Sequence, residues 1–168
     1  MATLAVWKFD TPTGADESAI TLEALDLQDI LALRDAATVS WRRTMNKPRT
    51  RQLPGHTPQG NLNSSFWGLL FGMIFFVPLL GAAIGAAGGA LAGSLTDVGI
   101  DDSFINKVRD QVTPGTSALF VLGPDAVVHT IEAAFAVHQP AGRIVTRLSA
   151  EQDTALRSVF AEESAPTP

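Results

Sequence analysis

The chain has 168 residues, of which 46% are hydrophobic and 7% aromatic, and its formal net charge is −5. This negative charge argues against a general nucleic-acid-binding surface, so we expect no nucleic-acid partner. The sequence contains no cysteine, which excludes disulfides, thiolate nucleophiles and cysteine-based zinc sites. The first ten residues lack a basic region followed by a long apolar run, so they predict no signal peptide.

The first 53 residues predict a strand, a helix and two further strands. Residues 3–9 alternate and are rich in β-forming side chains, which indicates a first strand. Residues 15–25 place apolar side chains near helical spacing and acidic side chains early, as is typical of a helix N-terminus. Residues 36–43 predict a second strand, and residues 49–53 predict a third strand that returns after a turn as a hairpin.

A long apolar stretch follows this hairpin, and it contains no Asp, Glu, Lys or Arg from Gln52 to Thr96. Residues 54–65 are rich in Gly, Pro, Asn and Gln, which marks a linker loop. Residues 66–96 predict an apolar helical hairpin that turns at Pro78. The turn is expected there because a proline inside a helix removes one hydrogen bond and clashes with the preceding turn.

The two arms of this hairpin are short for a membrane span. At 1.5 Å per residue, residues 66–77 would extend for about 18 Å and residues 79–95 for about 26 Å. A bilayer core is about 30 Å thick, so neither arm spans it comfortably alone. The strands on either side are too few to form two separate sheets, so both flanks should lie together. This requires a hairpin that is re-entrant, or one that is shielded by copies of itself in an oligomer.

Glycine recurs at every fourth position in the hairpin, which places the glycines on one helix face. Each glycine costs about 1 kcal/mol against alanine in a helix interior, so this spacing makes sense if another backbone packs into the groove. We therefore predict a glycine-zipper packing surface. Its predicted residues are Gly68, Gly72, Gly81, Gly85, Gly89 and Gly93, with Phe71, Phe75 and Phe76 as apolar flank.

The remaining chain predicts alternating helices and strands. The expected elements are a helix over 101–112, a strand over 116–122, a helix over 124–137, a strand over 142–148 and a helix over 150–162, before a disordered tail over 164–168. The strand over 116–122 is apolar on both faces, as expected of a central strand. Ser149 and Gln152 form a capping-box pattern at the start of the last helix.

This order of elements predicts an α+β fold. Residues 1–53 and 97–163 are expected to form one split α+β domain, a small sheet-and-helix unit similar in logic to a ferredoxin-like split βαβ. The apolar glycine-zipper helical hairpin over 66–96 interrupts that domain.

A basic cluster precedes the apolar stretch. It consists of Arg42, Arg43, Lys47, Arg49 and Arg51. These side chains are candidate contacts with an anionic lipid surface, although a solvated β-hairpin without a partner explains them equally well. Trp67, at the mouth of the apolar stretch, fits either an interfacial anchor or simple packing.

The sequence shows no constellation of catalytic or metal-binding residues. His56, His129 and His138 do not have metal-ligand spacing, and the serines lack a nucleophile motif. The glycine-rich stretch lacks the Lys-Ser/Thr ending of a phosphate-binding loop. We therefore predict no catalytic residue, no metal site and no cofactor.

The chain resembles a bacterial and archaeal family of predicted membrane proteins built on a domain of unknown function. The resemblance rests on residues 35–53, on FWGLLFGMIFFVPLLGAAIGAAGGALAG, on LTDVGIDDSFINKVRDQVTPGTSALFVL and on GRIVTRLSAEQDTAL. It implies a glycine-zipper hairpin on a small α/β domain, and it supplies no catalytic residues.

These observations predict a non-enzymatic, self-associating protein at the cytoplasmic face of a membrane, with itself and membrane lipid as partners. The alternative is a soluble cytoplasmic homo-oligomeric scaffold whose hairpins pack in a shared interior. A third hypothesis is a ligand-binding or enzymatic α+β module that uses the hairpin only as an anchor. The sequence does not determine the subunit number, any ligand or the physiological role.

Overall fold

The computed structural model describes residues 2–27, 35–52, 67, 70–76, 100, 102–138 and 140–152. The elements in chain order are β1 (Ala2–Phe9), α1 (Gly14–Leu27), β2 (Asp35–Ser40), β3 (Arg49–Gln52), η1 (Gly72–Phe76), α5 (Asp102–Gln111), β4 (Ser117–Pro124), α6 (Asp125–Phe135), η3 (Ala136–His138) and β5 (Gly142–Arg147). The predicted α+β fold is confirmed, and so is the order of strands and helices over the described ranges.

The five strands form one antiparallel sheet in the order β3-β2-β4-β1-β5. β4 pairs with β1 on one side and with β2 on the other, so β1 and β2 run in the same direction with β4 between them. Every residue of β4 from Ser117 to Gly123 is buried. The prediction of a central strand is therefore confirmed, because a strand covered on both faces needs apolar side chains on both.

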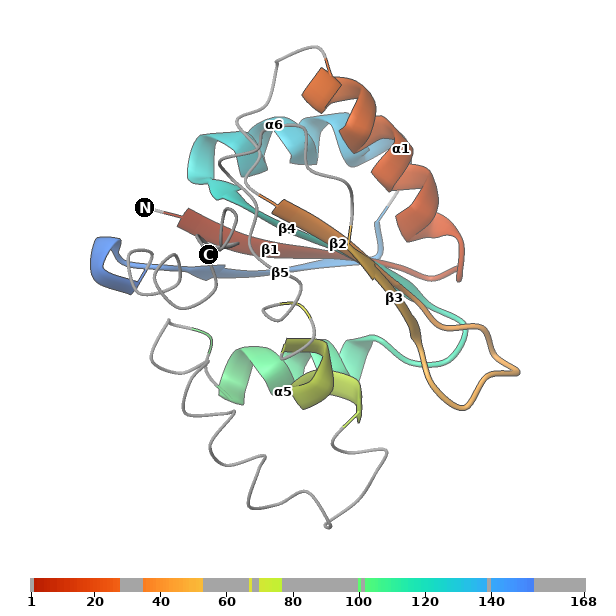
Figure 1. Ribbon diagram of the computed structural model, residues 1–168. Helices are drawn as coiled ribbons and strands as arrows, with labels where there is room; N and C mark the ends of the chain where they lie inside the picture. Colours follow the sequence, from red (N-terminus) through yellow and green to blue (C-terminus); the bar gives the residue numbers. More distant parts are fainter. Residues whose placement is uncertain are drawn as a thin grey trace, which may run out of the picture.

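Helices cover both faces of this sheet (Figure 1). α1 and α6 lie on one face, and α5 lies on the opposite face with η1. Side chains alternate between the faces along each strand. Leu119 of β4 thus packs with α1 and α6, whereas the next residue, Phe120, packs on the α5 side.

The face under α1 and α6 is closed by small side chains on α1 and larger ones on α6. Ala15 and Ala19 of α1 are buried there and are small, so this helix can lie close to the sheet, and Leu22 is buried beside them. From α6, Phe135 meets the ring of Trp7 edge-on, with 5.2 Å between the ring centroids. These contacts fix both crossover helices against β1 and β4.

The opposite face is covered by α5 together with the beginning of the apolar segment. α5 supplies Phe104, Ile105 and Val108, but a helix of 10 residues does not cover a five-stranded sheet. The remainder of the cover comes from five residues of the apolar segment, Trp67, Leu70, Phe71, Ile74 and Phe75. Residues 66–96 were expected to form an apolar helical hairpin that interrupts the domain. Of this range, the structure describes residues 67 and 70–76, and the five apolar side chains just named pack on the sheet as part of the core of the domain.

Polar side chains satisfy main-chain groups at the starts of two helices. Ser117 is fully buried; its hydroxyl accepts a hydrogen bond from the Ala15 N–H at 2.9 Å and donates one to the Thr11 carbonyl oxygen at 2.7 Å. This serine satisfies one of the free N–H groups at the start of α1. The predicted capping box is confirmed, since Gln152 N–H donates to Ser149 Oγ and Ser149 N–H donates to Gln152 Oε1.

Candidate functional site

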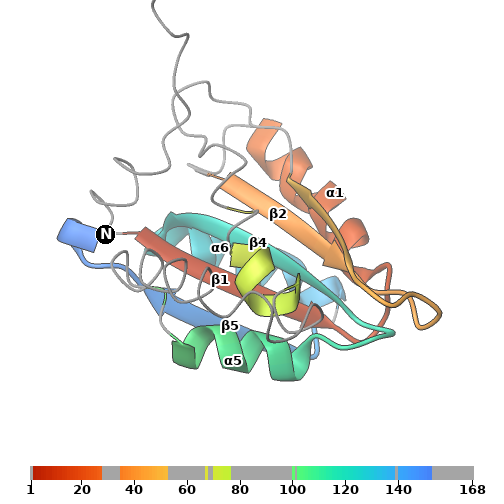
Figure 2. The same cartoon turned by 60° about the horizontal axis from the view of Figure 1, so that its bottom comes forward.

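Two features of the structure bear on function, and the first is the junction between η1, near the start of the apolar segment, and α5, which follows that segment. η1 and α5 lie side by side on the same face of the sheet (Figure 2). Arg109 of α5 joins them, because its Nε donates to the Ile74 carbonyl oxygen at 2.9 Å and its Nη2 donates to the Met73 carbonyl oxygen at 2.7 Å. These carbonyls lie near the end of a helical segment, where backbone acceptors lack helical partners.

Aromatic side chains hold this junction to the sheet. Phe71 meets Phe120 of the central strand edge-on at 5.0 Å, and Trp67 stacks on Phe71 with 5.7 Å between ring centroids. Phe75 contacts Trp41, which follows β2, at 6.0 Å. The rings thus tie the apolar segment to β2 and β4 together.

Trp67 is placed differently from a lipid-surface anchor. Its side chain is only 2% exposed and lies inside the core, which corresponds to the packing alternative. Phe71 and Phe75, which were expected to flank a glycine groove, are 3% exposed and face the sheet. All three side chains are apolar and come from the part of the segment nearest the domain, so the sheet face provides the closest surface on which they can be buried.

Gly72 is the predicted groove glycine whose surroundings the structure describes. A Cβ atom built at this position would meet no atom within 4 Å. No backbone among the described residues therefore packs against Gly72. The other groove glycines, the hairpin turn at Pro78 and the side chain of Phe76 lie outside the described residues.

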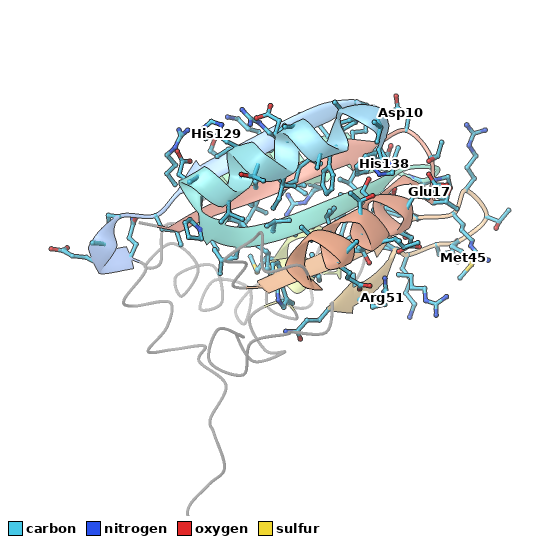
Figure 3. The ribbon with its side chains drawn as sticks, turned by 90° about the horizontal axis from the view of Figure 1, so that it is seen from above. Asp10, Glu17, Met45, Arg51, His129 and His138 are labelled. Carbon is cyan, nitrogen blue, oxygen red and sulfur yellow. The ribbon has the colours of Figure 1, made fainter. Side chains whose placement is uncertain are left out.

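The second feature is a cavity of about 480 Å³ beside the β2–β3 hairpin, which we call the β3-edge cavity. Its floor is made by the side chains of Thr38 and Ser40 on β2, which pair across the ladder with Arg51 and Arg49 on β3. Its lining residues are Pro12, Thr13, Asp16, Thr38, Ser40, Arg42, Met45, Lys47, Arg49 and Arg51. Figure 3 shows Met45 and Arg51 at one end of the molecule beside α1, with His129 near the other end of α6.

The sheet geometry explains why the basic side chains converge. Side chains two residues apart on a strand point to the same face, so Arg49 and Arg51 both lie on the face that α1 covers. β3 is the edge strand, and α1 packs mainly on β2 and β4, so the cavity lies between the start of α1 and the hairpin. Arg42 and Lys47 come from the hairpin loop and line the same cavity.

The charge of the β3-edge cavity is strongly positive. Four cationic side chains face a single carboxylate, Asp16, so three positive charges are unbalanced. Asp16 accepts a hydrogen bond from the Ser40 hydroxyl at 3.5 Å and lies 3.8 Å from Arg51 Nη2. Across the described ranges, Arg42, Lys47 and Arg49 form no ion pair.

Arg43, the fifth predicted basic residue, lies elsewhere. Its side chain lies over the turn between α5 and β4, where a Cβ atom at Gly115 would approach Arg43 Nε at 2.9 Å. Gly115 also has a φ of +92°, a conformation that favours glycine. The sequence could not separate Arg43 from its neighbours, since the direction of its side chain depends on the loop.

Sequence reasoning missed the contribution of α1 to this cavity. Pro12, Thr13 and Asp16 are far in sequence from the basic cluster, and only the pairing of β2 with β4 brings α1 over β2. One usable signal was present. The alternation of Thr38 with Ser40 and of Arg49 with Arg51 places two hydroxyls and two guanidinium groups on one face of a predicted hairpin.

The histidines have structural surroundings where they are described. The Thr21 hydroxyl and His138 Nε2 are 2.8 Å apart, which connects α1 with η3. His129 lies 3.7 Å from Asp125 on the exposed side of α6. Within the ranges that the structure describes, no three His, Asp or Glu residues are grouped so that they could hold a metal ion.

Among the helices that the structure describes, none is both long and apolar enough to cross a bilayer.

Comparison with known proteins identifies a family. Neither the curated proteins nor the solved structures gave a match to the chain. The model of the family described as protein of unknown function (DUF1269) matches residues 61–161, which is more than half of the chain. This range begins before the apolar segment and continues through α5, β4, α6 and β5. The chain therefore belongs to the DUF1269 family.

Proposed function

We propose that this protein is a non-enzymatic, self-associating protein of a membrane surface. In this proposal the glycine-spaced segment forms a helical hairpin that packs against the same hairpin in neighbouring copies. The packing groove consists of Gly68, Gly72, Gly81, Gly85, Gly89 and Gly93. The α+β domain then carries the hairpin on the cytoplasmic side of the membrane.

One observation carries the proposal: both ends of the glycine-rich segment start from the same face of the domain. η1 precedes the segment and α5 follows it, and Arg109 connects the two through hydrogen bonds to Met73 and Ile74. A segment that leaves and returns on one face of the domain has to reverse its direction. This requirement favours a hairpin over a single crossing, and Pro78, shortly after η1, provides a break at which the chain can turn away from the sheet.

The arrangement of the domain supports the proposed ferredoxin-like fold. The strands β2, β4, β1 and β5 lie in that order, with α1 and α6 as the two crossover helices on one face. We propose that this four-stranded unit is the ferredoxin-like core. β3, η1 and α5 are then additions between its second and third strands, and they cover the face that the crossover helices leave free.

The open surroundings of Gly72 favour self-association. A glycine in a helical segment lowers helix stability, and no contact within the described chain requires it at this position. A helix from a second copy would explain why the position has no side chain. The same observation fits a soluble homo-oligomer with a shared apolar interior, which is the second candidate.

The test is a double substitution that fills the groove. Gly81→Leu with Gly85→Leu is expected to abolish assembly while the far-ultraviolet circular dichroism of the α+β domain is kept. Ala82→Leu with Ala86→Leu is the matched control, because it adds the same kind of bulk to the adjacent side of the helix. The size of the purified particle is measured by light scattering, and membrane binding by flotation with vesicles.

The two candidates differ in the flotation result. Wild-type protein that floats with vesicles supports the membrane-surface protein, whereas discrete particles that stay at the bottom support the soluble oligomer. A Gly81→Leu, Gly85→Leu variant with the particle size of wild type contradicts self-association through the glycine groove.

A further inference from the structure

We propose that the β3-edge cavity is a binding site for the phosphate group of a small organic ligand. The cavity lies beside α1 and β3, on the face of the sheet opposite to η1 and α5. It is therefore separate from the proposed self-association surface and does not depend on it.

The arrangement of cations fits a phosphate group better than a single carboxylate. Arg49 and Arg51 approach from one strand and Arg42 from the loop, so guanidinium groups line two sides of the same cavity. Arginine presents planar pairs of N–H donors that match two oxygens of a phosphate at once. A phosphate monoester offers three such oxygens and nearly two negative charges at neutral pH.

The charge balance also calls for a bound anion. The cavity holds three unbalanced positive charges, although the whole chain carries a net charge of −5. Cations concentrated in a hollow focus the electrostatic field and attract anions. The two partners of Asp16 do not change this excess, since Ser40 is neutral and Arg51 is only one of the four cations.

The floor of the cavity supplies an additional donor. Thr38 lines the cavity, and its hydroxyl makes no hydrogen bond to the described residues. It is therefore available to donate a hydrogen bond to a ligand oxygen. Residues at the N-terminal end of α1 line the opposite wall, where the helix dipole favours negative charge.

The size of the cavity indicates a ligand larger than phosphate alone. About 480 Å³ lies within the usual range of small-molecule sites, roughly 300–1,000 Å³. Met45 and Pro12 give part of the wall an apolar character. We assign the phosphate to the arginines and Thr38, and the organic part of the ligand to the side of Met45.

A phosphate monoester of this kind can belong to a soluble metabolite or to a lipid headgroup. The experiment therefore uses two probes that carry the same phosphate monoester group. Binding of glycerol 3-phosphate in solution is measured by isothermal titration calorimetry. Binding of phosphatidate in phosphatidylcholine vesicles is measured by co-sedimentation. Pure phosphatidylcholine vesicles provide the reference, so that binding through the hairpin is subtracted.

The test variant is Arg49→Ala with Arg51→Ala. It is expected to weaken binding of whichever probe the wild type binds by more than about tenfold. Arg143→Ala with Arg147→Ala is the matched control, because it removes two exposed arginines from β5, outside the cavity. Thr38→Val is expected to weaken binding several-fold without changing any charge.

Loss of glycerol 3-phosphate binding in the test variant supports the site with a soluble ligand. Loss of phosphatidate-dependent sedimentation alone supports it with a lipid ligand. The proposal is overturned if neither probe binds wild type, or if the control variant loses as much affinity as the test variant. The test variant should keep the wild-type particle size. Failure of the proposed phosphate site is therefore distinguishable from failure of the proposed self-association.

Discussion

The guanidinium group of Arg109 donates a hydrogen bond to the main-chain carbonyl oxygen of Ile74 at 2.9 Å and joins two segments that are 35 residues apart. A second hydrogen bond goes to the Met73 carbonyl oxygen. One side chain thus fixes the main chain of η1 to the last turn of α5. The two described elements that flank the glycine-rich segment are therefore held to one another.

Replacement of this side chain should loosen the junction. Arg109→Met keeps the apolar stem but removes the donors, and it is expected to lower the free energy of unfolding by about 1.5–3 kcal/mol, since the lost hydrogen bonds come from a charged group. Urea denaturation checks this value. Lys107→Met on the exposed side of α5 is the control, and an equal loss in both variants would contradict a specific role for Arg109.

Ser117 connects β4 with the start of α1. Ser117→Ala leaves the Ala15 N–H and the Thr11 carbonyl oxygen without their buried partner. We expect the free energy of unfolding to fall by about 1–3 kcal/mol, the usual effect of leaving buried polar groups unsatisfied. Ser103→Ala on the exposed surface of α5 should change stability very little by comparison. Thermal or urea unfolding of both variants measures the difference.

The same substitution at two glycines should have opposite effects. Gly72→Ala is expected to stabilise the domain by about 0.5–1 kcal/mol, because its Cβ atom meets open space and alanine favours a helical backbone. Gly14→Ala should destabilise it, since the new Cβ atom would lie 2.5 Å from Phe9 Cβ. Unfolding is measured under conditions in which the protein is monomeric, so that self-association does not contribute to the measured stability. A destabilised Gly72→Ala variant would show that a close neighbour packs there.

Asp125 should titrate below its ordinary value of 3.8. Burial by itself raises the pKa of Asp125, but a hydrogen bond from Thr3 and the positive charge of Arg147 outweigh this effect. The folded protein then binds this proton less readily than the unfolded chain. The contribution of Asp125 to stability is present above pH 3.8 and is lost as the pH falls through the folded pKa.

Carboxyl titration by NMR measures this pKa directly. Arg147→Ala and Thr3→Val are each expected to raise the pKa of Asp125 towards its ordinary value, since each removes one interaction with the charged form. Arg143→Ala is the control, because Arg143 pairs with Glu132 and not with Asp125. An unchanged pKa in the first two variants would contradict the assignment.

The sequence was sufficient for the elements whose pattern is local. β4 was recognisable as the central strand because both of its faces are apolar, and Ser149 with Gln152 identified a helix start. The alternating residues of β1 gave its position to within one residue. In each case the residues that determine the element lie close together in the sequence, so the pattern can be recognised without knowledge of the tertiary structure.

The elements that depend on distant partners could not be obtained in this way. Trp67 and Phe71 are apolar side chains that would suit either lipid or the face of a sheet. They pack on the sheet because α5 is too short to cover that face alone, and this cannot be seen from their own sequence. The β3-edge cavity depends on the position of α1 relative to β2, which is set by side chains on other strands. Ser117 gave no signal, because a serine at a strand start is usually an ordinary solvent-facing residue.

The central place of β4 determines when the domain can close during synthesis. β1 and β2 do not pair with each other, and both wait for residues 117–124 to join them. The ribosome makes the whole glycine-rich stretch before it makes β4. The apolar stretch is therefore exposed to membranes, chaperones or another nascent copy while its own sheet is still incomplete. At about 5–20 residues per second, the time between synthesis of the apolar stretch and synthesis of β4 is a few seconds. During this time the apolar stretch can bind a membrane, a chaperone or another nascent copy before the sheet is complete.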